Sequence, residues 1–494
     1  MPDVHDLGLM IDSRIPLIVI QSREETRALD MITRLALKRA LPLYNWSCTE
    51  GLQRLGFGFD LVSKDSKSEP DEILAHIKSE TTPSVFVLCD FHPWLEDAPK
   101  RVRMLKDIAL RYERYRHTVI LLSHELTLPN EIRHLSANFL LRLPSSEQIL
   151  GLVREEALHW SQSNGAARVK TDNATLQQLV KNLQGMTFTE ARRLARGAIV
   201  DDGAITSSDI PAVNKAKFEL MDMEGVLSFE YDTARFNEVG GLENLKSWIN
   251  LRKKAFAGET NTEHLDPPKG LLLLGVQGGG KSLAAKAIAG LMQIPLLRLD
   301  FGRLYNKFFG ETEKNLREAL KLAELMSPCV LWMDEIEKGI GQDQNDQGVS
   351  QRLLGTLLTW MAEKKHPVFI VATANKVQTL PPELLRKGRL DEIFFVDLPD
   401  ETTRKEIFSI HLKKRSLKPD EFNLNQLAQM SEGFSGAEIE QSVVSALYSA
   451  SAKDATVDTA AIVEELGGTQ PLSVVMAEEI FALRAWASER TVKA

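Results

Sequence analysis

The residue types best suited to phosphate chemistry lie in one stretch, residues 269–290, which reads KGLLLLGVQGGGKSLAAKAIAG. It matches the pattern G-x-x-x-x-G-K-[ST] at Gly275, Gly280, Lys281 and Ser282. Residues without side chains let backbone N–H groups surround a phosphate, and the N-terminus of a following helix adds a favourable dipole. We therefore expect Lys281 to reach the β- and γ-phosphates of a nucleotide and Ser282 to hold Mg²⁺.

The flanks of the motif favour this interpretation over a glycine turn that binds nothing. Leu271 to Leu274 predict a short buried strand before the loop, and the alanine-rich sequence after Ser282 favours a helix. A strand, a glycine loop and a helix in that order are the context that the pattern needs. The residues of this unit expected to contact the nucleotide are Gly275, Gln277, Gly278, Gly279, Gly280, Lys281, Ser282 and Leu283.

Two carboxylates and an amide end later predicted strands. The run CVLWMDE (329–335) leads into Asp334, expected to hold Mg²⁺ through water, and Glu335, expected to polarise the attacking water. Such a run alone is as often a strand that reaches solvent, but its place about 50 residues after the phosphate loop favours the catalytic interpretation. Asn375 ends the next strand and is expected to orient the water; the alternative is an asparagine that caps a turn.

Two arginines, Arg386 and Arg389, flank Lys387 and Gly388 in LPPELLRKGRLDE (380–392). A solvated basic turn is the commoner meaning of such a cluster. The functional interpretation is an arginine finger, which stabilises charge on the transferring phosphoryl group of a neighbouring subunit. That interpretation requires a ring of subunits.

The elements that must position these residues follow an α/β pattern in both halves of the chain. The first half has predicted strands at 15–20, 41–46, 84–90, 117–123 and 139–144. The second half has them at 271–274, 295–300, 329–334, 367–373 and 392–399. Strands that alternate with helices at this spacing indicate parallel sheets. The rest is predicted as helices over 146–220 with a break at Gly185, an irregular connection over 221–241, and helices over 401–454 and 472–490.

The two halves resemble each other at an offset near 250 residues, which indicates a duplication; accidental α/β similarity is the alternative. Where the second half has its glycine loop, the first has QSREETR (21–27), without glycine or lysine and with an excess of acid. Asp90 keeps the position of Asp334, whereas Leu126 falls where the second half has Asn375. We therefore expect the first half to be catalytically inactive and free of nucleotide.

Composition limits the classes of partner. The chain has 494 residues, enough for two to four domains, and its net charge of -8 argues against nucleic acid as the default partner. Cys48, Cys89 and Cys329 are predicted to be buried reduced thiols. No apolar run approaches the ~18 residues of a membrane span, and the acidic N-terminus lacks the basic region of a signal peptide. Together these features favour a cytoplasmic protein.

Residues 236–450 resemble the AAA family of the AAA+ ATPases. The glycine loop, Asp334 with Glu335, Asn375, and the two arginines match the family's Walker A, Walker B, sensor 1 and arginine fingers. The resemblance implies ATP and Mg²⁺ as ligands, and it adds further nucleotide contacts at Val239, Gly240, Gly241, His411, Gly436 and Ala437. Leu390-Asp391-Glu392 departs from the Phe-Asp-Arg that is common in the family, so the coupling between subunits could differ.

The stretch YNKFFGETEKNLREAL (305–320) resembles the family's first pore loop and the helix after it. Phe308, Phe309 and Gly310 occupy the aromatic–hydrophobic–glycine positions, which in ring-shaped relatives grip a polypeptide. The alternative is a pair of phenylalanines that pack the start of a helix into the core. Over nearly its whole length the chain is also similar to the hypothetical-chloroplast-reading-frame AAA ATPases of plastids, cyanobacteria and other bacteria.

The expected architecture is a tandem of P-loop AAA+ modules, each with a parallel sheet and a helical lid, of which the first is degenerate and the second active. The expected parts are a degenerate α/β domain (1–145), its lid (146–221), a linker (222–241), the ATPase core (242–400), a second lid (401–468) and a C-terminal helix (469–494). The expected function is Mg²⁺-dependent ATP hydrolysis by a homo-oligomeric, hexameric ring that remodels a protein client. The alternatives are a nucleotide-gated assembly scaffold with slow turnover and, disfavoured by charge, a nucleic-acid-remodelling ATPase.

Overall fold

The computed structural model describes residues 2–55, 68–221, 226–231, 239–257, 264–304, 311–340, 347–386 and 388–494. Its chain divides into two compact units. The first unit comprises Met1–Gln148 and Thr187–Ala191, and the second comprises Ile149–Met186 and Arg192–Ala494. Each unit is described by itself.

The first unit is built on a mostly parallel sheet in the order β3-β2-β4-β5-β1-β6. Only the edge pair β2–β3 is antiparallel among its described strands. The strands are β1 (Leu17–Gln21), β2 (Leu43–Ser47), β3 (Gly51–Leu55), β4 (Val85–Cys89), β5 (Thr118–Ser123) and β6 (Ser136–Phe139). All residues of β4 and β5 are buried, as expected of central strands covered on both faces.

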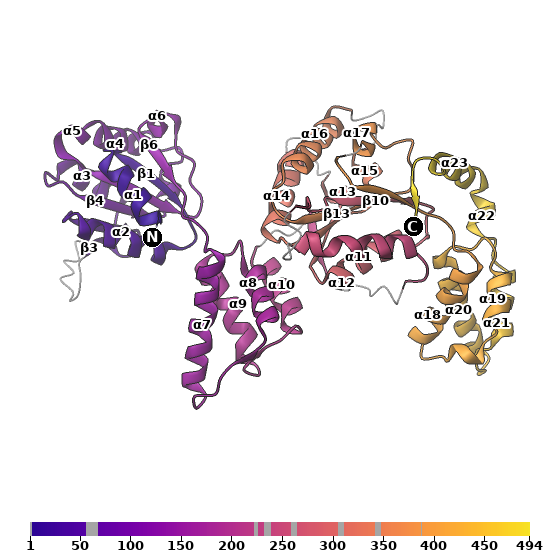
Figure 1. The fold of residues 1–494 in the computed structure, drawn as a ribbon. Helices are drawn as coiled ribbons and strands as arrows, with labels where there is room; N and C mark the ends of the chain where they lie inside the picture. The colour runs from indigo at the N-terminus through magenta and orange to yellow at the C-terminus, as the bar shows by residue number, and fades with distance from the viewer. Residues whose placement is uncertain are drawn as a thin grey trace. The chain divides into compact units, whose positions relative to one another are not determined.

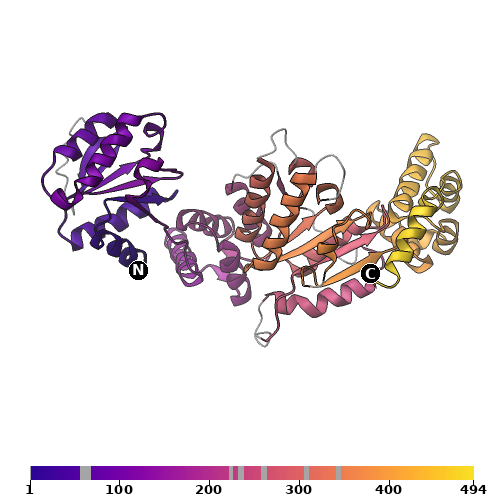
Figure 2. The same cartoon turned by 90° about the horizontal axis from the view of Figure 1, so that it is seen from above.

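Helices cover both faces of this sheet (Figure 2). One face packs against α1 and α2, and the other against α3, α4 and α6. Alternate residues of one strand serve the two faces, because successive side chains of a strand point in opposite directions: Ile18 and Ile20 face α2, whereas Leu17 and Val19 face α4. The helical elements are α1 (Pro2–Asp12), α2 (Glu25–Lys38), α3 (Pro70–Ser79), η1 (His92–Trp94), α4 (Pro99–Leu110), α5 (Tyr112–Tyr115) and α6 (Asn130–Arg133).

A group of helices follows, with the break predicted at Gly185. That glycine has φ +80° and separates α8 from α9. The elements here are α7 (Ser146–Ser163), β7 (Lys170–Thr171), α8 (Asn173–Leu183), α9 (Phe188–Val200), β8 (Ala204–Ile205) and α10 (Asp209–Leu220). Lys217 of α10 is buried, and its ammonium donates to the carbonyl of Asn182 (2.9 Å) in the last turn of α8 and to that of Gln184 (2.6 Å) just after it. This cation ties α10 to the end of α8.

The second unit contains a larger sheet in the order β15-β14-β10-β13-β12-β11-β9. Its strands are β9 (Leu227–Glu230), β10 (Gly270–Gly275), β11 (Leu296–Leu299), β12 (Cys329–Met333), β13 (Val368–Ala374), β14 (Glu392–Val396) and β15 (Val492–Lys493). The parallel strands of each sheet can be numbered 1 to 5 along the chain, starting at β1 and at β10 and leaving out the edge strands β3, β9 and β15. With this numbering both sheets have the spatial order 5-1-4-3-2. The two units thus share one strand topology.

The larger sheet is also covered on both faces (Figure 1). One face packs α11 and α12, and the other packs α13 to α16. The four leucines Leu271 to Leu274 alternate between these two cores. The helices are α11 (Glu243–Ala257), α12 (Lys281–Met292), α13 (Phe301–Leu304), α14 (Glu311–Leu325), α15 (Ile336–Ile340), α16 (Gln347–Glu363) and α17 (Pro382–Leu385).

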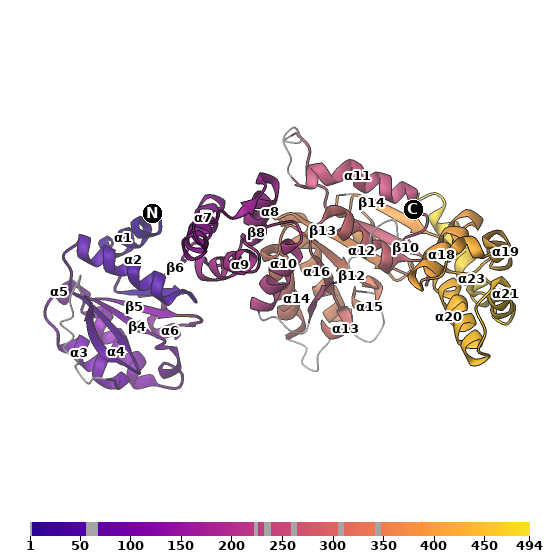
Figure 3. The same cartoon turned by 90° about the horizontal axis from the view of Figure 1, so that it is seen from below.

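A helical bundle follows β14 and stands beside the sheet (Figure 3). It comprises α18 (Glu401–Lys414), η3 (Pro419–Glu421), α19 (Leu424–Met430), α20 (Gly436–Ala452) and α21 (Thr459–Gly467), around a core of its own. Ser435 and Glu438 form a capping box at the start of α20, which fixes where that helix begins. The chain then forms α22 (Leu472–Val475) and α23 (Ala477–Ala487) and ends in β15 at the edge of the sheet.

Three predicted elements differ from the structure. The run 139–144 is not a strand: β6 ends at Phe139, and Leu140, beyond the last paired residue, is 79% exposed. The connection 221–241 contains β9, which pairs antiparallel with β11; a four-residue strand is too short to show a period. The helix predicted over 472–490 is two helices, because Met476 has φ -120° and ψ 34° and interrupts it.

Two further predictions are wrong in detail. Cys48 is exposed because it follows the last residue of β2 in the turn to β3, whereas Cys89 and Cys329 are buried. The alignment of Leu126 with Asn375 is one residue out of register. Cys89 pairs with Leu122 and Met333 pairs with Ala372, so Glu125 takes the place of Asn375.

Candidate functional site

A cavity of about 540 Å³ lies where the parallel strands of the second unit end at the bundle. Its lining is mixed, with backbone and polar groups at the strand ends and both apolar and charged side chains at the bundle. Such a volume suits a small-molecule ligand. The predicted residues that line it are Val239, Gly240, Gly241, Gln277, Gly278, Gly279, Gly280, Lys281, Ser282, Leu283, Asp334, Glu335, Asn375, His411, Gly436 and Ala437.

The glycine loop between β10 and α12 depends on two of its glycines for its shape. A Cβ at Gly275 would overlap the carbonyl oxygen of Val396, so β14 passes close to the start of the loop only because that side chain is missing. Gly280 has φ +96°, which L-residues with side chains rarely adopt, and it is the residue immediately before α12. The loop therefore delivers the first turn of α12, with its free N–H groups, into the cavity.

Lys281, the first residue of α12, is only 7% exposed. Its ammonium donates to the carbonyl oxygens of Gly275 (2.9 Å) and Val276 (2.8 Å). Burial lowers the pKa of Lys281 to about 8, while the nearby carboxylates of Glu337, Asp334 and Glu335 act in the opposite direction. A buried ammonium lined up with a row of free N–H groups favours an anionic ligand.

Asp334 follows the last residue of β12 and is held from two sides. Its Oδ1 accepts a hydrogen bond from the hydroxyl of Thr373 (2.7 Å), and its Oδ2 accepts one from Arg298 (2.8 Å). Arg298 lies on the neighbouring strand β11 and stacks on Trp332. The sequence prediction missed both partners, because they come from different strands.

Glu335 lies next to Asp334, with φ +48°. Its N–H donates to the hydroxyl of Thr373 (3.0 Å), and its Oε1 accepts from Asn375 Nδ2 (3.1 Å). Lys338, one turn further along, forms an ion pair with Oε2, which raises the pKa of Lys338. Glu335 and Asn375, predicted at the ends of successive strands, lie within hydrogen-bond distance of each other.

The other end of the cavity carries its apolar lining, Val239 with Ile407 and Ile410 of α18, beside the polar side chains of His411, Lys414 and Glu440. Val239 is buried against Ala287 of α12, and Gly241 donates its N–H to Glu406 of α18 (3.0 Å). A Cβ on Gly240 would come within 3.1 Å of Ile407, so the segment and α18 approach closely. This end suits a flat apolar group such as a nucleobase, and Lys281 at the other end suits phosphates.

His411 lies half-buried at this apolar end. Burial lowers its pKa, against the opposing effect of Glu440, whose Oε1 is 3.4 Å from Nδ1. Arg415 also approaches Nδ1, at 3.5 Å. Glu440 and Arg415 thus both hold the imidazole ring from its Nδ1 side.

The cavity includes side chains that no motif indicated. Among the polar ones are Thr373, Asp397, Lys414, Glu440 and Lys493. Lys493 arrives through β15, which pairs with β14 at Phe394–Val492 and Phe395–Lys493. A strand of two residues leaves no periodic signal, so only the folded chain brings this lysine to the cavity.

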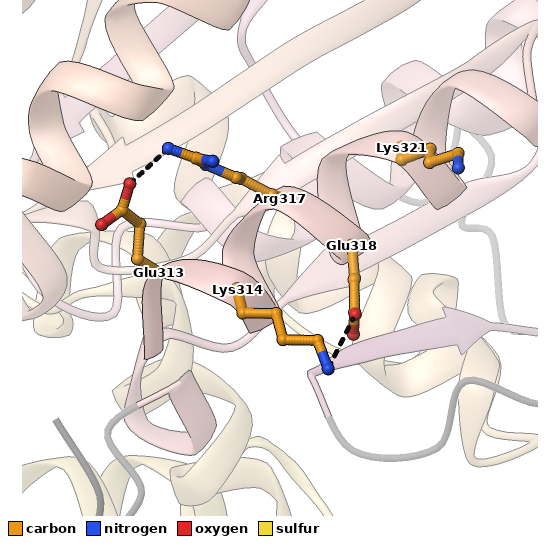
Figure 4. A pocket seen from close by; sticks show the side chains of 5 residues that line it. All are labelled: Glu313, Lys314, Arg317, Glu318 and Lys321. Atoms are coloured by element: carbon orange, nitrogen blue, oxygen red, sulfur yellow. Dashed lines mark hydrogen bonds and ion pairs between the residues drawn. The ribbon is translucent and has the colours of Figure 1, made fainter. Parts of the chain in front are cut away.

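Some predicted residues lie elsewhere. Arg386 is exposed and Arg389 is half-buried, with its guanidinium donating to the carbonyl of Leu358 in α16, and neither lines the cavity. Phe308, Phe309 and Gly310 lie outside the described residues. The helix after them, α14, has a charged outer face bordering a hollow of about 380 Å³, where Glu313 pairs with Arg317 (2.6 Å) and Lys314 with Glu318 (3.7 Å) (Figure 4). These side chains of one helix satisfy each other and offer no convergent site.

Comparisons with known proteins identify the family of the chain. The model of the ATPase family associated with various cellular activities (AAA) matches residues 271–398. Two SpoVK-like AAA ATPase models match as well, the N-terminal domain at 3–139 and the second domain at 147–224. The AAA domain-containing protein ycf46 of Pyropia yezoensis is 34% identical over 491 residues, which cover 98% of this chain and 97% of that protein. The chain belongs to the AAA ATPase family.

Other relatives of this AAA protein include the ycf46 protein of Guillardia theta, 35% identical over 100% of this chain and 96% of its own length. The proteasome-activating nucleotidase of Aeropyrum pernix is 34% identical over 299 residues, 57% of this chain and 70% of its own. Family membership supports ATPase activity in general. Within the described part of the AAA protein, no helix is both long and apolar enough to cross a membrane.

Proposed function

We propose that this protein hydrolyses ATP with Mg²⁺ at the cavity of the second unit. The observation that carries the proposal is the convergence of Lys281, Glu335 and Asn375 in one cavity, although they come from α12 and the ends of two strands. Phosphoryl transfer to water needs a cation that holds the phosphates, a carboxylate that polarises the water and a polar group, here an amide, that orients the water.

The polar end of the cavity has the donor atoms for Mg²⁺. Ser282 offers a hydroxyl and Asp334 a carboxylate, and oxygen ligands of this kind suit the ion. When bound, Mg²⁺ supplies neutralising charge at the β- and γ-phosphate oxygens. Thr373 holds Oδ1 of Asp334 in place, so the carboxylate keeps its orientation.

The catalytic roles follow from the contacts. Glu335 accepts the proton of the attacking water, and Asn375, which already donates to its Oε1, positions the carboxylate. Lys281 and the N–H groups of the first turn of α12 stabilise the negative charge on the phosphates. Val239, Gly240, Gly241, His411, Gly436 and Ala437 would enclose the nucleoside at the apolar end.

We propose further that the first unit binds no nucleotide. Its loop between β1 and α2 is shorter than the loop between β10 and α12, running from Ser22 to Glu24. Glu24 is 6% exposed at the N-terminal end of α2, and its carboxylate accepts from Arg27 (2.8 Å) and from the N–H of Thr189 (3.3 Å). A buried carboxylate thus holds the place where a phosphate would have to bind.

The division of the chain that we propose is the one expected from sequence: an inactive module (1–145 with lid 146–221), a linker (222–241), and an active module (242–400 with lid 401–468) followed by residues 469–494. The shared strand order of the two units supports the duplication. The site lies between core and lid of the second module, so ATP binding would draw these two parts together.

The protein acts, in this proposal, as a homo-oligomeric ring on a protein client. Arg386 is exposed and does not line the cavity of its own chain, which suits a residue that completes the site of a neighbour. Phe308 and Phe309, just before α14, would grip the client.

A second candidate is a nucleotide-gated scaffold with slow turnover. Ion pairs within the chain hold both acidic residues of the site: Asp334 with Arg298, and Glu335 with Lys338. If these pairs persist with ATP bound, hydrolysis is slow and the nucleotide mainly controls assembly.

Substituting Phe308 separates the two candidates. Phe308→Ala should abolish ATP-dependent unfolding of a tagged test protein while ATP turnover stays within about twofold, and Phe308→Tyr should retain both. Mass photometry of Glu335→Gln with and without ATP reports the assembly. Rings without any unfolding activity in the wild-type protein would favour the scaffold, and a monomer under both conditions would overturn the ring.

A further inference from the structure

Three metal-binding side chains gather at the carboxyl edge of the sheet in the first unit. Asp90 follows β4, His92 begins η1, and His124 follows β5. One donor atom from each lies within 4.8 Å of the others. Parallel strands bring their carboxyl ends to the same edge, so residues far apart in sequence meet here.

A serine organises this group, here called the histidine cluster (Asp90, His92 and His124). The Ser123 hydroxyl lies 2.7 Å from Nδ1 of His92 and 3.2 Å from Oδ1 of Asp90. His124 Nδ1 is 3.9 Å from the same Oδ1, and the two imidazole rings lie edge to face with centroids 5.1 Å apart. A hydroxyl bonded to one ring nitrogen fixes the orientation of the imidazole, as outer-shell partners do around metal-bound histidines.

The cluster stands at the same place in the sheet as the carboxylates of the second unit. There, the hydroxyl of Thr373 bonds Oδ1 of Asp334; here, that of Ser123 bonds Oδ1 of Asp90. The strand ladders align these two pairs. The first unit therefore keeps the carboxylate and its hydroxyl but adds two imidazoles. Because we propose above that this unit binds no nucleotide, the imidazoles call for another ligand.

A cavity of about 600 Å³ opens beside the cluster. His92 and His124 line it, so an ion held there faces open space on one side. Its other polar lining residues are Glu96, Glu125, Thr127, Asn130 and Arg133. An exchangeable ligand would have room to reach the ion from this side.

We propose that the histidine cluster binds a divalent first-row transition metal ion of the Zn²⁺ class. Two imidazoles and one carboxylate make a three-ligand set with an open fourth position. Mg²⁺ is the wrong ion for it, because Mg²⁺ takes oxygen ligands. A tetrahedral ion about 2.0–2.1 Å from each donor atom sets the donor atoms about 3.3 Å apart. They now lie within 4.8 Å of one another, and small rotations of the exposed Asp90 and His124 side chains would bring them to the shorter distance.

Titration of the full-length chain with Zn²⁺ against a competing chromophoric chelator tests the proposal. The background is Cys48→Ser, which removes the exposed thiol as a competing ligand. One equivalent of Zn²⁺ should bind per chain. His92→Ala or His124→Ala should weaken binding by more than about 100-fold, because removing a direct metal ligand lowers the affinity more than the 10- to 100-fold caused by removing an outer-shell partner. Ser123→Ala should weaken it by about tenfold.

Matched variants keep the result interpretable. His134→Ala removes an exposed histidine of the same unit outside the cluster, and Asp334→Asn alters the acidic site of the second unit; both should bind Zn²⁺ as the parent does. The absorption bands of bound Co²⁺ should show a tetrahedral site in the parent and not in the His92 variant. Equal binding by parent, His92→Ala and His124→Ala, with circular dichroism showing all three folded, would overturn the proposal, and so would the absence of binding by the folded parent.

Discussion

The amide of Asn375 donates a hydrogen bond to the carboxylate of Glu335, with Nδ2 and Oε1 3.1 Å apart. The two residues follow adjacent parallel strands, β12 and β13, and the backbone N–H of Asn375 also donates to Glu337 (2.9 Å). The main chain of Asn375 is thus fixed, and its side chain holds the carboxylate of Glu335, the candidate catalytic base. The side chain of Asn375 therefore orients the carboxylate of Glu335.

Replacing Glu335 should separate binding from hydrolysis. Glu335→Gln removes the base but keeps the shape and the acceptor oxygen for Asn375, so we expect kcat to fall by roughly 10²- to 10⁴-fold with little change in ATP affinity. Asn375→Ala should lower kcat by about 10- to 100-fold, because the carboxylate remains but loses its orientation. Steady-state phosphate release and fluorescent-nucleotide binding measure the two quantities.

Glu363→Gln is the matched control, since this exposed glutamate lies at the end of α16, outside the cavity. It should hydrolyse ATP at the wild-type rate. Unchanged hydrolysis in Glu335→Gln would remove Glu335 from the mechanism.

The binding of ATP should weaken in alkaline solution because of Lys281. Burial lowers its pKa to about 8, so the free protein holds the ammonium charged below this pH and loses the charge as pH rises through it. The phosphates need the charged form. The apparent Kd for ATP should therefore be flat from pH 7 to 7.5 and rise toward tenfold per pH unit above about 8.5.

Lys281→Arg tests the cause of this dependence, because a guanidinium stays charged throughout the range. Its affinity is expected to be lower, with no rise in Kd up to pH 9.5. Lys217 and Lys364 also have pKa values lowered to about 8 by burial, but they do not line the cavity and are present in both proteins. A rise of equal slope in Lys281→Arg would assign the effect to another group.

Much of this site is predictable because its signals are local. Gly280, Lys281 and Ser282 are adjacent in sequence, and the strand before them and the helix after them come from short-range patterns. The sequence also places Glu335 and Asn375 at one edge of the sheet, because both follow parallel strands, although it does not predict their hydrogen bond.

Other contacts depend on pairings that no local pattern encodes. Arg298 reaches Asp334 only because β11 lies beside β12, and Lys493 reaches the cavity only through the short strand β15. The sequence comparison matched Leu126 to Asn375, whereas the strand registers match Glu125 to it. An error of one residue arises easily when strands are aligned without their hydrogen-bond pairing.

The wild-type chain should bind one nucleotide, not two. The second unit offers a cavity around Lys281, whereas in the first unit the buried carboxylate of Glu24 lies at the start of α2 and repels phosphate. Equilibrium titration with a fluorescent ATP analogue should give a stoichiometry of one per chain. Lys281→Ala should give none, and Lys286→Ala, which alters an outward lysine of the same helix paired with Glu230, should still give one. Residual binding in Lys281→Ala would place a second site in the first unit.

Mixing two inactive variants tests whether each site is completed by a neighbour. Lys281→Ala subunits lack a working phosphate loop but keep Arg386, and Arg386→Ala subunits have the reverse defect. If Arg386 acts across the subunit boundary, mixed rings contain some complete sites. With random mixing, half of the sites have an intact phosphate loop, and half of those have a neighbour with an intact Arg386. An equimolar mixture should therefore regain roughly a quarter of the wild-type ATPase rate.

Arg389→Ala is the informative comparison. Its guanidinium is already bound to the carbonyl of Leu358 in its own chain, so its loss should lower thermal stability more than Arg386→Ala does and complement Lys281→Ala less clearly. A mixture no more active than its components would mean that the site is complete within one chain, and the exposed position of Arg386 would then need a different explanation.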